Sequence, residues 1–401
     1  MIVLIATNEQ FPIGMACTNR IISLAKGLVE NAVAVKVVCF QTTEKREQTL
    51  NSDARGFYEG IEFEYTSGTT VVGSTILRRK WLGLRSLARA LRILVDARRR
   101  SDHCVLFLYT TSARYILFFY LAARLLGIVL VQDEVEYPTV LLKKPKSRLA
   151  RIYAGLYTSC VYRLFDAILV MTTRLEVYFK DRIRKRARIL RVPMTVEMSR
   201  FLTNTWSSPE KSKYIAYCGY VGGNKDGVQN LLEAFAELDA RHDDVKLYVI
   251  GDSGGNSDLE RLQQTARDLG IQHRVVFTGR VLRSEIPRYL CNATILALAR
   301  PAGLQSEGGF PSKLGEYLAT GNPVVLTRVG DIPEFLTDGN DAFLVEPDDV
   351  DGFARKLDYV LSHEDLAKDV GLRGREVARA NFDYHVRGEK TAQFLRALFN
   401  N

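Results

Sequence analysis

The sequence predicts an α/β protein of two Rossmann-like domains, each built on a parallel sheet. Short apolar runs alternate with amphipathic helical stretches along the chain, a pattern typical of repeated βαβ units. The 401 residues suffice for two domains with separate cores. Apolar residues make up 47% of the chain and charged residues 25%, the proportions of a folded globular protein.

The first domain is predicted to span residues 1–195 and to open with a βαβ unit. The run Ile2–Ala6 is a predicted strand, because it lacks the basic flank and the length of a signal peptide. Thr18 is expected to cap the helix that leads to strand Val33–Phe40. Gly14 precedes this helix and lets a ligand approach the backbone, although a single loop glycine is also typical of an ordinary turn.

Residues 75–100 predict a basic amphipathic helix. Its apolar positions at helical spacing are Leu77, Trp81, Leu84, Leu87, Leu91 and Leu94. Its nine basic residues are Arg78, Arg79, Lys80, Arg85, Arg89, Arg92, Arg98, Arg99 and Arg100. We expect the apolar face to pack on the sheet and the basic face to meet water or anionic lipid headgroups.

The apolar stretch 113–132 is long enough to cross a membrane. Arg114, Arg124 and Gly127 interrupt it, so we predict a buried helix followed by the strand Ile128–Val131. No transmembrane segment is predicted.

Three acidic residues follow that strand, namely Asp133, Glu134 and Glu136. They lie at the carboxyl end of a predicted parallel strand, where open sheets bind their ligands. Sugar hydroxyls, a cation or basic side chains would relieve their mutual repulsion. We expect them to line a ligand site; the alternative is ion pairing with the nearby Lys143, Lys144 and Lys146.

The two predicted domains are joined by a segment rich in Pro, Ser and Thr. Strands Ala167–Met171 and Ile189–Val192 complete the first sheet. Residues 196–212 are the predicted linker. The second domain is predicted over residues 213–380, with a final helix over 381–401.

The second domain repeats the order of strand, polar loop and helix. Strands are predicted at Tyr214–Cys218, Lys246–Ile250, Val275–Phe277 and Ile295–Leu298. Gly223 and Lys225 lie in the first loop, where a lysine suits a diphosphate or is simply solvated. Arg280 and Arg300 follow the third and fourth strands, and Arg300 suits either a phosphate or an ion pair with Glu307.

The stretch 306–347 carries the most position-specific residues of the chain. Ser312 is expected to cap a helix whose start attracts phosphate, and Glu316 lies roughly 5 Å further along the axis, where it suits ribose hydroxyls. The residues predicted to line this site are Gly309, Phe310, Lys313, Leu314 and Glu316. Phosphate plus ribose indicates a nucleotide; a surface turn before an ordinary helix is the alternative.

The distribution of charge and the spacing of cysteines indicate the class of partner and the cellular compartment. Residues 1–200 hold 32 Lys+Arg against 17 Asp+Glu, whereas residues 201–401 hold 23 against 29. The basic half predicts an anionic surface as partner, either nucleic acid or membrane. The six cysteines are scattered singly, which predicts reduced cysteines of a cytosolic protein. No Asp-x-Asp or His-rich cluster offers a metal site, so no metal or cofactor is expected.

The runs EGGFPSKLGEYLATGNPVV and VGDIPEFLTDGNDAFLVEPDD resemble the donor site of nucleotide-sugar glycosyltransferases of the family 4 ("group 1") type. The resemblance implies the GT-B fold, with two domains facing a central cleft and a last helix that crosses back to the first domain. The family pattern has two glutamates separated by seven residues. Glu316 matches the second, but Gly308 occupies the position of the first, and Glu307 lies one residue early.

The same resemblance assigns roles to single residues. It implies that Glu316 binds ribose, that Lys225 binds the donor phosphates and that Arg280 lies beside the base. Gly14 would face donor and acceptor, and the residues predicted above at 309–316 would lie on the donor side. Asp133, Glu134 and Glu136 would lie on the acceptor side, with Asp133 in place of a histidine that the family often has beside the donor sugar. The expected catalytic residues are Lys225, Glu316 and Asp133.

The expected function is transfer of a sugar from a nucleoside diphosphate sugar to a lipid-linked or membrane-surface glycan, as in polysaccharide or lipopolysaccharide biosynthesis. We expect retention of configuration, no metal, and a cytoplasmic protein held peripherally on the inner face of an anionic membrane. The missing first glutamate leaves the donor sugar open.

Three other functions fit parts of the pattern. A nucleotide-sugar epimerase would share the fold and need no acceptor. An oxidoreductase is disfavoured because neither first βα loop has GxGxxG. A nucleic-acid binder would agree with a pI near 9.2, but only Trp81 interrupts the basic run, so base stacking lacks aromatic platforms and no nucleic-acid partner is expected.

Overall fold

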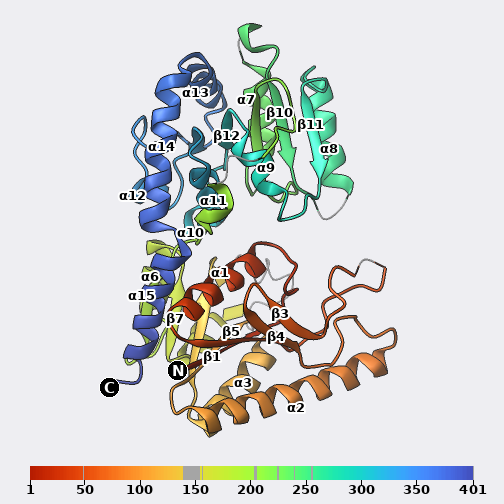
Figure 1. Cartoon of the computed structure of the whole chain (residues 1–401), viewed down its shortest axis with the longest axis vertical. Coiled ribbons are helices and arrows are strands. Elements are labelled where there is room, and N and C mark those ends of the chain that lie inside the picture. The colour runs from red at the N-terminus through yellow and green to blue at the C-terminus, as the bar shows by residue number, and fades with distance from the viewer. Residues whose placement is uncertain are drawn as a thin grey trace. The chain divides into compact units, whose positions relative to one another are not determined.

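The computed structural model of the chain divides into two compact units, Met1–Thr195 with Tyr384–Asn401, and Val196–Asp383 (Figure 1). The described residues are 1–47, 49–138, 154–155, 157–202, 206–223, 225–238, 240–253 and 256–400. Each unit contains one sheet with helices packed around it, so the predicted α/β class is confirmed.

The first unit contains an eight-stranded sheet in the order β3-β4-β2-β1-β5-β6-β7-β8. Its strands are β1 (Ile2–Thr7), β2 (Ala34–Cys39), β3 (Arg55–Tyr58), β4 (Ile61–Tyr65), β5 (Cys104–Tyr109), β6 (Val129–Glu134), β7 (Ala167–Val170) and β8 (Arg188–Arg191). All pairs are parallel except β3 with β4, which is antiparallel at one edge. The predicted strands of this unit are confirmed to within a few residues, whereas β3, β4 and β5 were not predicted.

Five α-helices of this unit have described bounds: α1 (Ala16–Glu30), α2 (Ile76–Arg100), α3 (Ala113–Leu126), α6 (Thr173–Lys180) and α15 (Tyr384–Ala397). Helix α1 connects β1 to β2 in one direction along the sheet, whereas α2 and α3 lead to β5 and β6 in the other. Right-handed crossovers therefore put α2 and α3 on the face opposite α1, as Figure 1 shows.

The second unit contains a six-stranded sheet in the order β11-β10-β9-β12-β13-β14, parallel throughout. Its strands are β9 (Tyr214–Cys218), β10 (Lys246–Ile250), β11 (Val275–Gly279), β12 (Ile295–Leu298), β13 (Val324–Thr327) and β14 (Phe343–Val345). Its helices are α7 (Val228–Ala236), α8 (Asn256–Asp268), α9 (Ile286–Cys291), α10 (Leu304–Gly308), α11 (Lys313–Thr320), α12 (Ile332–Phe335), α13 (Val350–Ser362) and α14 (Glu364–Asn381). The strand order reverses beside β9, and parallel sheets bind ligands at the carboxyl ends of strands at such a point.

The predicted linker folds with the second unit over its first residues. A short 3₁₀ helix, η2, covers Met198–Phe201, and the amide of Val196 donates to the carbonyl of Phe382 at 2.8 Å. At the other end of the chain, α15 packs against α1 of the first unit. The predicted return of the last helix to the first domain is therefore confirmed.

The stretch 113–132 divides as predicted into a helix and a strand. Helix α3 ends at Gly127, which has φ 63° and donates to the carbonyls of the last turn, and β6 begins two residues later. Among the residues that the structure describes, no helix combines the length and the apolar character needed to cross a bilayer.

The orientation predicted for α2 is wrong. Of the apolar face expected against the sheet, only Leu94 is buried; Leu77 is 79% and Leu84 is 72% exposed. The residues that pack inward are instead Leu82, Ser86, Ala90, Ile93, Leu94 and Ala97. This inner face contains alanines and a serine whose hydroxyl donates to the carbonyl of Phe40 at 2.8 Å, so the periodicity of the large apolar residues pointed to the opposite face.

The close approach of α1 and α15 generates a stability prediction. A Cβ on Gly27 of α1 would lie 2.7 Å from the Cα of Gly388 and 2.7 Å from the carbonyl oxygen of Tyr384. We expect Gly27→Ala to lower the free energy of unfolding by about 1–3 kcal/mol, because the helices must move apart. Urea unfolding followed by circular dichroism measures this change.

Gly83 of α2 provides the matched control. No described atom lies within 4 Å of a Cβ at this helical glycine. Gly83→Ala should therefore raise the free energy of unfolding by roughly 0.5–1 kcal/mol, through helix propensity alone. Equal effects of the two substitutions would contradict the packing derived for α1 and α15.

Candidate functional site

The loop from β9 to α7 occupies the point where the strand order of the second sheet reverses. Helix α11 is held against this strand end, because the amide of Cys218 donates to the hydroxyl of Tyr317 at 2.6 Å. The lysine at the start of α11, Lys313, crosses Gly219, where a Cβ would overlap its terminal atoms. Only glycine at position 219 therefore allows Lys313 to reach across the end of β9.

Asp226 gathers charged and polar groups at this loop. Its carboxylate pairs with the ammonium of Lys313, accepts from the hydroxyl of Tyr217 at 2.9 Å, and lies 3.5 Å from Nε of Arg300. Asp226 is 5% exposed and Arg300 is 1% exposed. Burial raises the pKa of Asp226, but the charges of Lys313 and Arg300 outweigh it, so the net shift is downward and the carboxylate stays ionised.

The two predicted phosphate-binding residues of the loop flank this cluster. Lys225 directly precedes Asp226, its side chain is half-buried, and its carbonyl accepts from Nε of Arg300 at 3.4 Å. Gly223 is exposed, has φ 64°, and donates its amide to Asp258 at 3.1 Å. The structure thus brings Lys313 and Arg300 together around one carboxylate, and the backbone carbonyl of Lys225 contacts the same arginine.

Glu316 lies one turn after Lys313 on α11. Its side chain is 26% exposed and pairs with Nη1 of Arg200 at 3.0 Å. Arg200 also donates from Nη2 to the carbonyl of Arg283 at 2.7 Å, so the guanidinium is held from two sides. Arg200 was not predicted as a site residue, because it lies in the segment interpreted as a linker, 116 residues before its partner in sequence.

The start of α11 differs from the prediction in two respects. Ser312 makes no side-chain cap, because its backbone is already helical. The amides of Gly309 and Leu314 donate to the carbonyls of Gln305 and Pro311, so both are already used within the protein. Gly308, which stands at the position of the family's first glutamate, is the last residue of the short helix α10.

Two predicted donor-side residues belong to the core. Leu314 is fully buried, and Phe310 packs edge-on against Phe335 with ring centroids 5.6 Å apart and beside Phe382 at 5.6 Å. Their side chains fix the position of the loop before α11. Arg280, by contrast, is exposed directly after β11.

Asp133 serves as an internal anchor of the first unit. Its carboxylate accepts from Nε and Nη2 of Arg20 at 2.6 and 2.8 Å and from the hydroxyl of Tyr109 at 2.6 Å. Arg20 also donates to the carbonyls of Val192 and Pro193 at 3.0 Å. The Asp133 side chain has no exposed surface, so this placement gives no support to the predicted contact with donor or acceptor.

The other two acids of this strand end differ from each other. Glu134 is 2% exposed, and burial, together with the neighbouring Asp133 charge, raises its pKa to about 8. Glu136 is half-buried. The alternative partners Lys143, Lys144 and Lys146 lie outside the described residues.

Gly14 is tightly packed before α1. Thr18 does not cap this helix, which begins at Ala16; its hydroxyl donates to the carbonyl of Gln10 at 2.6 Å and crowds Gly14. Any larger residue at Gly14 would displace this bond. The glycine therefore has a structural reason that does not require a ligand.

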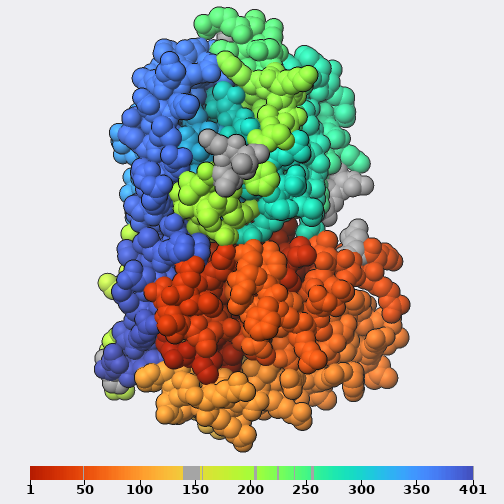
Figure 2. Space-filling view, viewed as in Figure 1, coloured from red at the N-terminus to blue at the C-terminus, as the bar shows by residue number. Residues whose placement is uncertain are grey.

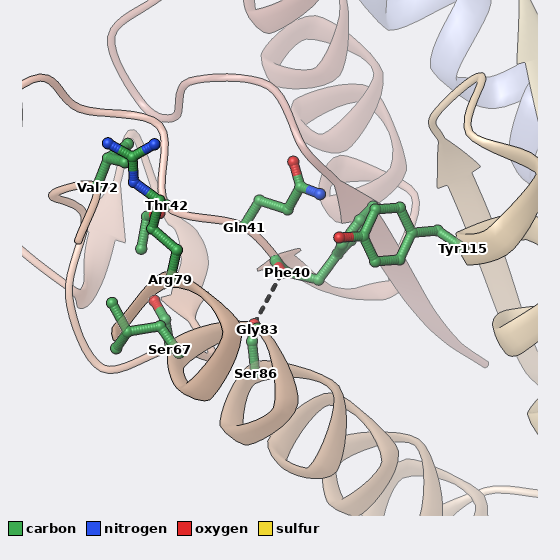
Figure 3. A pocket seen from close by; sticks show the side chains of 10 residues that line it. Phe40, Gln41, Thr42, Ser67, Val72, Arg79, Gly83, Ser86 and Tyr115 are labelled. Carbon is green, nitrogen blue, oxygen red and sulfur yellow. Dashed lines mark hydrogen bonds between the residues drawn. The ribbon is translucent and has the colours of Figure 1, made fainter. Parts of the chain in front are cut away.

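A cavity of about 180 Å³ lies in the first unit, at the carboxyl ends of β2 and β4 (Figure 3). Its polar lining comes from Gln41, Thr42, Ser67, Arg79 and Tyr115. These residues come from two loops and the starts of α2 and α3. Sequence patterns marked only Arg79, as part of the basic helix, and did not predict a cavity here. Within the described part of the chain, no group of His, Cys, Asp and Glu side chains is suited to hold a metal ion.

Comparison with known proteins relates the second unit to a described family. Residues 212–363 match the family model "Glycosyl transferases group 1". The GDP-mannose-dependent alpha-(1-6)-phosphatidylinositol monomannoside mannosyltransferase of Mycolicibacterium smegmatis is 34% identical over 174 residues, which cover 43% of this chain and 44% of that protein. The chain thus matches less than half the length of this curated relative.

Solved structures resemble the chain over nearly its whole length. Sucrose-phosphate synthase from Thermosynechococcus elongatus superposes with a TM-score of 0.74 at 16% identity, covering 100% of this chain and 99% of that one. HepE of Anabaena, solved with UDP-glucose, gives 0.70 at 14% identity, covering 99% and 100%. At such identities the likeness shows the fold alone, and it confirms the GT-B fold.

The buried Glu134 generates a pH prediction. Because its folded pKa of about 8 exceeds the ordinary 4.5, the folded state binds this proton more tightly than the unfolded chain. The stabilisation is fully present below pH 4.5 and is lost as the pH rises through 8. Deprotonation of Glu134 at high pH should lower the free energy of unfolding by at most about 5 kcal/mol. Glu134→Gln mimics the protonated form and should remove this pH-dependent decrease.

Urea unfolding of the full chain at pH 5, 7 and 9 measures the effect. The Gln variant should gain stability relative to the parent protein as the pH rises, whereas the matched control Glu136→Gln should follow the parent profile. Parallel profiles for the parent and Glu134→Gln would show that the buried carboxyl does not hold its proton.

Proposed function

We propose, from the premise that residues 212–363 form a domain of the glycosyl transferases group 1 family, that this protein transfers a sugar from a nucleoside diphosphate sugar to a lipid-linked or membrane-surface glycan. The second unit would bind the donor, and the first unit would bind the acceptor. The observation that carries the proposal is the pairing of Lys313 and Arg300 with the buried Asp226, directly after Lys225, where the strand order of the parallel sheet reverses.

The cluster suits a diphosphate for an electrostatic reason. Lys313 is held near the strand end by Asp226, so an incoming phosphate can recruit an ammonium that is already desolvated and oriented. Lys225 adds a second positive charge in the loop before α7. Gly223 beside it leaves room for the ligand, since no described atom faces its Cβ direction within 4 Å.

The proposed reaction places negative charge on these groups. The bond between the anomeric carbon and the diphosphate oxygen breaks, and its electron pair leaves with the diphosphate. The acceptor hydroxyl oxygen bonds to the anomeric carbon, and its proton passes to the departing diphosphate. Charge on the departing diphosphate grows in the transition state, where Lys225 and Lys313 stabilise it more than in the ground state. These cations can neutralise the diphosphate charge in place of a divalent metal ion, so we propose a metal-independent reaction.

The nucleoside would lie along α11. One carboxylate oxygen of Glu316 is paired with Arg200, and its partial exposure leaves the group able to accept from ribose hydroxyls. Arg280, exposed after β11, is the proposed neighbour of the base. Arg200 would act as a positioning residue that fixes the rotamer of Glu316.

Support for the acceptor comes from the first unit and from a relative. The polar cavity of Figure 3 offers hydroxyl, amide and guanidinium groups, which suit the hydroxyls or phosphate of a glycan. The name of the Mycolicibacterium relative describes a phosphatidylinositol monomannoside acceptor, which belongs to a membrane. We extend the proposal to polysaccharide or lipopolysaccharide assembly on the cytoplasmic face of a membrane.

The donor sugar and the stereochemistry depend on the departure from the family pattern. The names of the compared proteins include GDP-mannose and UDP-glucose, so both donors belong in a first screen. Retention of configuration is proposed by family resemblance. Glu307 lies on α10 one residue before the position of the family's first glutamate, so the residue that contacts the donor-sugar hydroxyls is not assigned.

Two substitutions in the second unit test the proposal through binding. Glu316→Gln should lose a charge-assisted hydrogen bond to ribose of about 1.5–3 kcal/mol, so it should weaken nucleoside and nucleoside diphosphate alike. Lys225→Ala should weaken binding of the nucleoside diphosphate and leave binding of the nucleoside unchanged. It should also slow turnover, because the phosphate charge grows in the transition state. Isothermal titration with both ligands separates the two effects, and each variant controls for the other.

Folding must be verified by circular dichroism, because Glu316→Gln also weakens the contact with Arg200. If the Glu316→Gln variant is folded and binds every nucleoside diphosphate in the screen with the affinity of the parent protein, the proposed donor site is wrong.

A further inference from the structure

Eight large apolar side chains are exposed on two adjacent helices of the first unit. On α2 they are Ile76, Leu77, Trp81, Leu84 and Leu91, and on α3 they are Leu117, Leu121 and Leu125. Their exposure is high, reaching 87% at Leu125. Soluble proteins rarely leave a large contiguous apolar surface uncovered, so this surface indicates a partner.

Helical geometry collects these residues into stripes. Leu77, Leu84 and Leu91 recur every seven residues, with Trp81 between the first two, so they share one side of α2. This side is opposite the inner face that contains Leu82 and Ala90. On α3, Leu117, Leu121 and Leu125 recur every four residues and likewise face away from the buried positions.

The two stripes belong to one surface, which we call the α2–α3 surface. Helix α2 packs against α3, and both lie on the face of the sheet opposite α1 (Figure 1). In the space-filling view the orange residues of α2 and the lighter orange residues of α3 adjoin along one border of the unit (Figure 2).

Positive charge surrounds the α2–α3 surface. Helix α2 contains nine Arg and Lys residues and a single acid, Asp96, while α3 contains two arginines and no acid. Lys80 lies on one side of the leucine stripe, and Arg85 and Arg92 lie on the other. Three other basic residues of α2 have partners within the protein: Arg89 pairs with Glu64 at 2.8 Å, Arg98 pairs with Asp102, and Arg79 donates to the carbonyl of Gly73 at 2.7 Å. The flanking cations are exposed and can reach an anionic surface.

We infer that the α2–α3 surface inserts its leucines and Trp81 into the interface of an anionic lipid bilayer. An apolar stripe with cations on both sides is the pattern of helices that lie in the plane of a membrane, with apolar side chains among the acyl chains and basic ones at the headgroups. A 25-residue helix extends this contact over about 37 Å. The surplus of cations favours anionic lipid over a second copy of this equally basic surface, which would repel it.

The inference deepens the proposed function, on which it rests for a membrane-bound acceptor. It also changes the mode of binding predicted from charge alone. Purely electrostatic adsorption weakens steeply as salt rises. Apolar insertion persists, because burial of hydrocarbon is not screened by salt.

Trp81 reports insertion directly. The chain has two tryptophans, so Trp206→Phe leaves Trp81 as the single tryptophan, which can be excited selectively over the tyrosines. With phosphatidylglycerol–phosphatidylcholine vesicles that carry brominated acyl chains, we expect a blue shift and strong quenching of Trp81 that survive 0.5 M NaCl. Vesicle-bound protein with unshifted, unquenched Trp81 emission would overturn the inference, as would the absence of vesicle binding.

A second arm changes the surface itself. The combination Leu77→Ser, Leu84→Ser, Leu121→Ser and Leu125→Ser should weaken vesicle affinity at least tenfold. The matched control Val177→Ser with Leu282→Ser, at sites 66% and 72% exposed elsewhere on the chain, should leave it unchanged. Equal losses of vesicle affinity in the four-serine variant and the control would overturn the inference. It would also be overturned if analytical ultracentrifugation shows that the parent protein and the control form a dimer and the four-serine variant does not.

Nucleoside diphosphate titration separates the two proposals. The four-serine variant should bind the nucleotide as the parent protein does, because the substitutions lie in the other unit. If the parent protein inserts into vesicles but binds no nucleotide, the proposed function fails while the insertion surface stands.

Discussion

The buried carboxylate of Asp226 is the contact on which the candidate donor site depends. If the Asp226 carboxylate were removed, Lys313 and Arg300 would be largely buried positive charges that lack this counter-ion, and unpaired buried charges are strongly destabilising. Gly219 allows the lysine to cross the end of β9, and Tyr317 holds α11 against the same strand. The site is thus preorganised by contacts within the second unit alone.

The first unit also contains a buried carboxylate paired with a basic side chain, but there the pair holds the fold together. Arg20 and Asp133 form a buried pair that joins α1 to β6 and to the carbonyls after β8, with Tyr109 from β5 as a third partner. The acid lies at the carboxyl end of a parallel strand, the place where ligands usually bind, yet all of its surface is used internally. Position at a strand end is therefore not enough to assign a catalytic role.

The α/β class and most of the strands could be predicted from the sequence, because apolar runs such as Tyr214–Cys218 are local signals; β3, β4 and β5 were missed. Partners distant in sequence could not: Asp226 lies 87 residues from Lys313, and Arg200 lies 116 from Glu316. The face of α2 was assigned wrongly because periodicity shows that a helix has an apolar stripe but not what covers it. Here alanines and a serine pack inward while the leucines remain exposed.

A crystal structure of the protein with a nucleoside diphosphate tests the central claim most directly. The account predicts ribose hydroxyls within about 3 Å of Glu316 and phosphate oxygens within about 3 Å of the ammonium of Lys313 or Lys225. Lys313 should then turn at least partly from Asp226 toward the phosphates. A nucleotide bound away from α11, with Lys313 still paired only to Asp226, would contradict the account.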